Sequence, residues 1–78
     1  MVKRILLTEL MDGHSGVVRS INAGRTATKR LVDMGLTPGT KVTIVKSMPF
    51  RGPVQVSVRG SKLAIGRGIA SKIFVEEL

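Results

Sequence analysis

Two neighbouring segments in the middle of the chain alternate apolar and polar residues. They are residues 41–46, Lys-Val-Thr-Ile-Val-Lys, and residues 54–59, Val-Gln-Val-Ser-Val-Arg. Because successive side chains of a β-strand point to opposite faces, this period predicts two half-buried strands that form a hairpin. The connection between them is too long for a two-residue turn, and Pro49 and Pro53 cannot donate ladder hydrogen bonds. We therefore expect it to project as a loop.

Three further segments have strand character. A turn signal at Asp12-Gly13 precedes residues 16–21, which predict a first full strand, and residues 62–65 and 73–76 predict two more. Residues 66–71, Gly-Arg-Gly-Ile-Ala-Ser, predict one helical turn before the last strand. The expected fold is mostly β, with about five short strands. A small barrel is favoured, because closing the sheet removes its exposed edges.

One α-helix interrupts this pattern after the first full strand. Residues 25–34 have helical spacing, and the apolar stripe consists of Ala23, Ala27, Leu31 and Met34. Arg25, Lys29 and Asp33 form a different, solvated stripe. Gly35 supplies a left-handed C-terminal cap, Leu36 can fold back on the last turn, and Pro38-Gly39 prevents the helix from resuming.

Size and composition narrow the class of protein. The 78 residues have room for one domain, residues 1–78, and only 3% of them are aromatic, so Val, Ile and Leu must fill the core. The absence of cysteine excludes a disulfide scaffold and a thiolate metal site, and it fits a reducing cytosol. No stretch approaches the ~20 apolar residues of a membrane helix. We expect a cytoplasmic protein that is not inserted in a membrane.

The chain is strongly basic, with 13 Lys and Arg against 5 Asp and Glu and a formal charge of +8. Nucleic acid, anionic lipid and acidic protein are the partners that such a charge attracts. The candidate basic surface consists of Arg25, Lys29, Arg30, Arg51, Arg59, Lys62 and Arg67. A barrel that binds nucleic acid is thus an alternative function. Only Phe50 and Phe74 could stack on bases, so no nucleic-acid partner is expected.

The sequence contains little evidence for a metal site or a catalytic site. His14 is the only imidazole, and Asp12 with Glu9, Glu76 and Glu77 could in principle add oxygen ligands for ferrous iron. No His or Cys pair has ligand spacing, so a solvated loop histidine and no resident cofactor are expected. No nucleophile has a neighbouring base and orienting group, and no phosphate-loop motif is present. The sequence therefore predicts a binding protein and not an enzyme.

The proline-containing loop is a candidate protein contact. A loop stiffened by Pro49 and Pro53 presents Phe50 at a low entropy cost, although Phe50 could equally tuck back over the end of the barrel. The expected partner-binding residues are Arg25, Lys29 and Arg30 on the helix together with Pro49, Phe50 and Arg51 in the loop.

Residues 30–40, Arg-Leu-Val-Asp-Met-Gly-Leu-Thr-Pro-Gly-Thr, resemble the hallmark of the ferrous-iron transport protein A (FeoA) family. Gly35, Leu36, Pro38 and Gly39 carry the structural part of that motif. Upstream and downstream segments follow the family's order, so the resemblance covers almost the whole chain. At Gly66-Arg67-Gly68 the chain departs from the family pattern, which usually carries a second charged residue there.

The resemblance implies an SH3-like barrel in the cytosol that assists the membrane ferrous-iron transporter FeoB, which bears a GTPase domain. It implies no cofactor beyond transient contact with ferrous iron. An iron chaperone is a third candidate function, after the transporter accessory protein and the nucleic-acid-binding barrel. Whether docking activates, inhibits or assembles the transporter stays open. So does self-association through a sheet edge.

Overall fold

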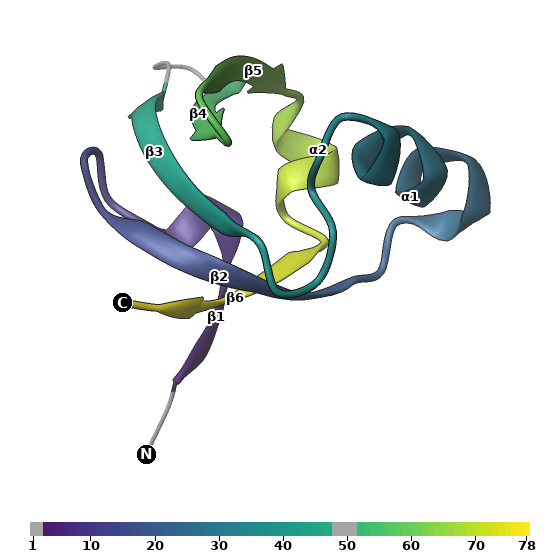
Figure 1. Ribbon diagram of the computed structural model, residues 1–78, viewed down its shortest axis with the longest axis horizontal. Helices are drawn as coiled ribbons and strands as arrows, with labels where there is room; N and C mark the ends of the chain where they lie inside the picture. The colour runs from purple at the N-terminus through teal and green to yellow at the C-terminus, as the bar shows by residue number, and fades with distance from the viewer. Residues whose placement is uncertain (1–2, 48–51) are drawn as a thin grey trace.

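Six short strands and three helical segments follow one another along the chain (Figure 1). The structure is a computed structural model that describes residues 3–47 and 52–78. In chain order the elements are β1 (Arg4–Leu6), the 3-10 turn η1 (Leu7–Glu9), β2 (Ser15–Ile21), α1 (Gly24–Asp33), β3 (Lys41–Ser47), β4 (Val54–Val58), β5 (Ser61–Ile65), α2 (Arg67–Ala70) and β6 (Ile73–Glu77).

The strands form one antiparallel sheet in the order β1-β6-β2-β3-β4-β5. Register shifts between Val18 and Ser20 in β2 and between Ile44 and Lys46 in β3 interrupt the ladders. Such bulges bend a strand and increase its twist. The sheet accordingly curves around a single interior, with β3 and β4 folded over β2 and β6 (Figure 1).

The prediction of a mostly β domain is confirmed, as are the helix after the first full strand and the short helix before the last. The structure has six strands where about five were expected, because Arg4–Leu6 also pairs with β6. The sheet is open, since no ladder joins its edge strands β1 and β5 within the described residues. The turn η1, which follows β1 directly, contacts α2.

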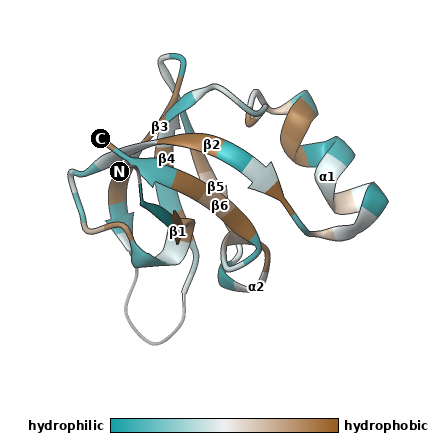
Figure 2. Cartoon of the chain, turned by 90° about the horizontal axis from the view of Figure 1, so that it is seen from below, coloured by the Kyte–Doolittle hydropathy of each residue, from teal (hydrophilic) through white to brown (hydrophobic). Residues whose placement is uncertain are grey.

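The core is aliphatic. Its buried members come from every strand except β1, from each helical segment and from the turns after η1 and α1: Leu7, Leu10, Val18, Leu31, Leu36, Val42, Ile44, Val54, Val56, Val58, Ile65, Ala70, Ile73 and Val75. β-Branched side chains dominate the list, as the strand-rich composition requires. Phe74 on β6 is half-buried. Brown and teal segments alternate along the strands in Figure 2, which shows the same division between core and solvent.

The end of α1 is fixed by a Schellman motif. The Gly35 N–H donates to the Val32 carbonyl and the Leu36 N–H to the Leu31 carbonyl, both at 2.9 Å, and Gly35 has φ 99°. A residue with a side chain is strained at such a φ. The turn brings Leu36 against the core next to Leu31, where both side chains are buried. This reversal sets the direction in which the chain enters β3.

The predicted apolar stripe of the helix is wrong at Met34, whose side chain is 44% exposed. Ala23 and Ala27 are only half-buried, so Leu31 is the one residue of α1 that is buried within the described chain. The Schellman turn explains the difference, because Leu36 takes the place in the core that the helical period assigns to Met34. As a result α1 stands beside the sheet and does not lie flat on it (Figure 1).

Candidate functional site

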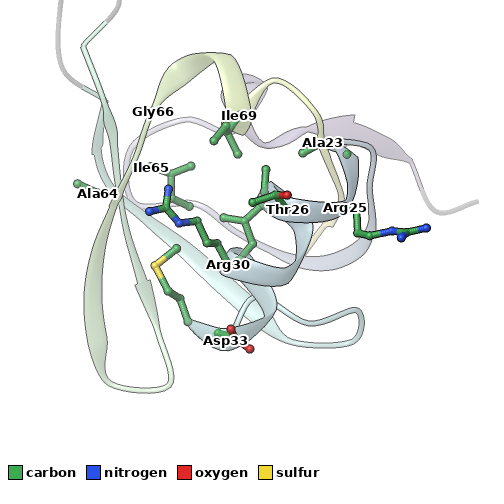
Figure 3. Close-up of a pocket in the computed structure, with 13 residues that line it drawn as sticks. Ala23, Arg25, Thr26, Arg30, Asp33, Ala64, Ile65, Gly66 and Ile69 are labelled. Carbon is green, nitrogen blue, oxygen red and sulfur yellow. The ribbon is translucent and has the colours of Figure 1, made fainter.

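A groove separates α1 from the segment that runs from β5 into α2. It has a volume of about 850 Å³, within the range of small-molecule sites. One wall is α1, and the other is formed by Ala64, Ile65, Gly66 and Ile69 (Figure 3). We call it the α1 groove; its α1 side consists of Ala23, Gly24, Arg25, Thr26, Ala27, Arg30, Leu31, Asp33 and Met34.

The floor of the α1 groove is apolar because the core reaches the surface there. Leu31 and Ile65 belong to the buried cluster, and Ile69 packs against it while remaining half-buried. Ala23 and Ala27 are too small to fill the gap between the helix and β5. The space therefore exists because α1 carries alanines, and not larger apolar residues, on the side that faces the sheet.

Charged residues line the helix side of the groove. Figure 3 shows Arg30 reaching from α1 toward Ala64 and Ile65, whereas Arg25 points away from the groove into solvent. The acid Asp33 pairs with Lys29 at 3.4 Å, with side chains that are 64% and 78% exposed. An ion pair so exposed contributes little stability. The groove thus joins an apolar floor to a rim with more positive than negative charge.

The second wall includes an edge of the sheet. β5 pairs with β4 alone, so its outer edge carries backbone groups that have no ladder partner within the described residues. Ala64, near the end of this edge, is exposed. An unpaired edge beside a groove is the arrangement in which an extended peptide can add a strand.

Arg25 and Arg30 both line the α1 groove, but only the Arg30 side chain reaches across it, and Lys29, also on α1, is exposed on the helix surface. The predicted contacts at Pro49, Phe50 and Arg51 lie outside the described residues. Of the other basic candidates, Arg59 and Lys62 belong to the β4–β5 hairpin and Arg67 to α2. The basic residues therefore do not all share the helix face.

The groove itself was not predicted from the sequence. The one signal that pointed to it is the pair of alanines at positions 23 and 27, which were assigned to a packed helix face. Alanine is compatible both with close packing and with an unfilled gap. Only the position of α1 relative to β5 distinguishes the two.

The weak metal candidates are held in other contacts. His14 Nδ1 lies 3.1 Å from Glu77 Oε2, and Asp12 Oδ1 accepts a hydrogen bond from the Ser47 N–H at 3.0 Å. Glu9 accepts from the Leu6 N–H at 2.7 Å, while Glu76 pairs with Arg19 at 3.0 Å. Within residues 3–47 and 52–78, no three His, Asp or Glu side chains form a group that could hold a metal ion.

None of the helices in the described part of the chain is long and apolar enough to cross a membrane. The longest, α1, has 10 residues.

Comparison with known proteins places these features in a family context. Residues 5–77 match the model of the FeoA domain family. An Fe(2+) transport protein A of Methanocaldococcus jannaschii is 44% identical over 66 residues, which are 85% of this chain and 78% of that protein. The crystal structure of an iron uptake regulatory protein (FeoA) is similar to this chain with a TM-score of 0.89 and 39% identity, and the match covers 97% of this chain and 100% of the other.

A third relative is much longer than this chain. It is an Fe(2+) transport protein A/Fe(2+) transporter FeoB fusion protein of Porphyromonas gingivalis, 31% identical over 70 residues. The match covers 90% of this chain and 8% of that protein. The match of the family model to nearly the whole sequence, together with the identity to a transport protein A, shows that this chain belongs to the FeoA domain family.

Proposed function

We propose that this chain is a non-enzymatic, cytoplasmic accessory protein of ferrous-iron uptake, and that it docks on the cytoplasmic part of the FeoB transporter. The observation that carries this proposal is the fusion relative, in which a segment like this chain and an FeoB transporter form one polypeptide. Domains that are fused in one organism and separate in another commonly act together. The separate chain then has to supply by binding what the fusion supplies by covalent linkage.

The α1 groove is the surface we assign to this docking. Its apolar lining offers area that a partner's aliphatic side chain can bury, and Arg30 at the rim favours a partner segment that carries carboxylates. The unpaired edge of β5 offers hydrogen bonds to an extended backbone. The partner segment would thus be extended, acidic and partly apolar.

Affinity and specificity are expected to come from different parts of the groove. Apolar contact on Ile69, Ala64 and Met34 supplies most of the binding free energy, because these residues of the groove keep accessible apolar area that a partner can remove from water. Arg30 selects the acidic partner and speeds the encounter, an effect that salt screens. The same reasoning makes the docking sensitive to ionic strength.

Replacing Arg30 by glutamate is expected to weaken association with the full-length transporter in detergent by about tenfold, or about 1.4 kcal/mol. The reason is that a carboxylate at this rim repels the acidic segment that the arginine attracts. Co-purification and a binding titration at low and physiological salt measure the effect. Lys3→Glu is the matched control, because it makes the same change of charge at an exposed residue outside the α1 groove.

Cells that lack this protein provide the second measurement. We expect reduced ferrous-iron uptake, restored by the unaltered chain and by Lys3→Glu but not by Arg30→Glu. If the chain and the transporter do not associate and uptake is normal without the chain, the proposed function is wrong. If association is intact in Arg30→Glu, the function stands and the α1 groove is not the docking surface.

A further inference from the structure

A second hollow lies away from the α1 groove and has a different chemistry. It has a volume of about 510 Å³ and is lined by Gly39, Thr40, Lys41, Thr43, Ser57 and Arg59. We call it the hydroxyl hollow, because three of its six residues present hydroxyl groups. Two others present cations, and no carboxylate lines it.

The cations of the hydroxyl hollow are available to a ligand. Within the described residues neither Lys41 nor Arg59 takes part in an ion pair. Arg59 makes one long contact, from Nη2 to Thr40 Oγ1 at 3.4 Å, which leaves most of its five N–H donors unused. Lys62 adds a third positive charge, because it stands directly opposite Ser57 in the β4–β5 ladder.

The hydroxyl groups of Thr43 and Thr40 are held in place by neighbouring hydroxyl groups. Thr43 and Ser57 are opposite one another on β3 and β4, and Thr43 Oγ1 lies 2.7 Å from Ser15 Oγ. Thr40 is 7% exposed, its carbonyl accepts from the Val18 N–H at 2.9 Å, and its Oγ1 lies 2.8 Å from Thr37 Oγ1. These donors therefore need little reordering when a ligand arrives, which lowers the entropy cost of binding.

The backbone conformation of Arg59 independently indicates that the hydroxyl hollow is a functional site. Arg59 and Gly60 form the two-residue turn between β4 and β5, with φ 50° and 83°. A turn in which both residues have positive φ favours Asn-Gly, Asp-Gly or Gly-Gly, and a bulky residue there is strained. Arg59 is the one residue other than glycine with positive φ in the described chain. Such strain is typical of functional positions, because a turn chosen for stability alone would avoid it.

We propose that the hydroxyl hollow binds a phosphate group, either as inorganic phosphate or as the phosphate of a small nucleotide. Lys and Arg with Ser and Thr hydroxyls are the donors that hold a tetrahedral dianion, and charge-assisted hydrogen bonds are about twice as strong as neutral ones. The lining contains no aromatic or large apolar side chain on which a base could stack. The site therefore recognises the phosphate and not the group attached to it.

The test is a nuclear magnetic resonance titration of the complete chain with inorganic phosphate and, separately, with GMP, at constant ionic strength. We expect saturable shifts at the amides of Thr40, Lys41, Thr43 and Arg59, with affinities for the two ligands that agree within about threefold because both present the same dianion. Shifts that grow without saturation, or that follow Lys and Arg over the whole surface, would overturn the proposal. Binding of GMP without binding of phosphate would do the same.

Arg59→Asn separates binding from folding. Asparagine suits the left-handed turn, so this variant should unfold at a higher temperature than the unaltered protein while its affinity for phosphate falls by about tenfold. Lys29→Asn removes the same charge from an exposed position on α1 and should leave the affinity within about twofold of the original value. Retention of phosphate affinity in Arg59→Asn would show that the arginine serves only the turn. These measurements do not involve the transporter. They therefore test the phosphate site independently of the proposed docking.

Discussion

Replacing Leu36 by alanine is expected to lower the free energy of unfolding by about 3 to 4 kcal/mol. The Leu36 side chain is fully buried, and the Schellman motif fixes its position beside Leu31. Truncation leaves a cavity at the point where the chain passes from α1 to β3, and the hydrogen-bonded turn prevents the neighbours from closing it. A domain of this size has about 4 to 12 kcal/mol of stability in total. Such a loss would leave a large fraction unfolded at moderate urea concentrations.

Urea denaturation followed by circular dichroism measures this change. Val32→Ala is the control, because Val32 lies four residues earlier, in the last turn of α1, with 38% of its surface exposed. It should change the stability by less than about 1 kcal/mol. Equal losses in the two variants would mean that Leu36 is not a core residue, contrary to the packing described here.

Replacing Gly16 by valine is expected to lower the free energy of unfolding by about 3 kcal/mol. Here the cause is not a cavity but the lack of space for a side chain. A Cβ atom at residue 16 would lie 3.0 Å from the Glu76 carbonyl oxygen and 3.1 Å from two carbon atoms of Val75. Valine adds two methyl groups to that contact. β2 and β6 would have to move apart, and the ladder that joins the centre of the sheet would weaken.

The matched control is Gly68→Ala in α2, where a Cβ atom would meet nothing within 4 Å. Alanine forms helices better than glycine, so this variant should be more stable by up to about 1 kcal/mol. Thermal unfolding of the two variants should therefore shift in opposite directions. A Gly16→Val protein as stable as the original would refute the close approach of β2 to β6.

The sequence predicted those parts of the fold whose signals are local. β3 and β4 alternate apolar and polar residues, and Gly35 with Pro38 marks the end of α1, so both were assigned within a residue or two. Local signals failed where a long-range contact decides the outcome. Arg4–Leu6 is too short to show a period, and it is a strand only because β6 offers it an edge.

The candidate site was predictable only in part, for the same reason. Arg25 and Arg30 followed from the charged face of α1, yet nothing local shows that Ala64 and Ile69 stand across from them. Met34 is exposed because Leu36 occupies the neighbouring place in the core. Helical periodicity cannot predict this, because Leu36 lies beyond the end of the helix. Arg59 was expected to be one more surface cation, because its left-handed backbone is fixed by the hairpin and not by its own preference.

The place of β6 in the sheet has a consequence for the order in which the domain can form. β6 contains the last strand residues, Ile73–Glu77, and it lies between β1 and β2, the first two strands of the chain. Segments that are about 70 residues apart in the sequence must therefore meet before these three strands can pair. Pairings between segments that are distant in the sequence form slowly, so folding on a timescale of about milliseconds to seconds is expected.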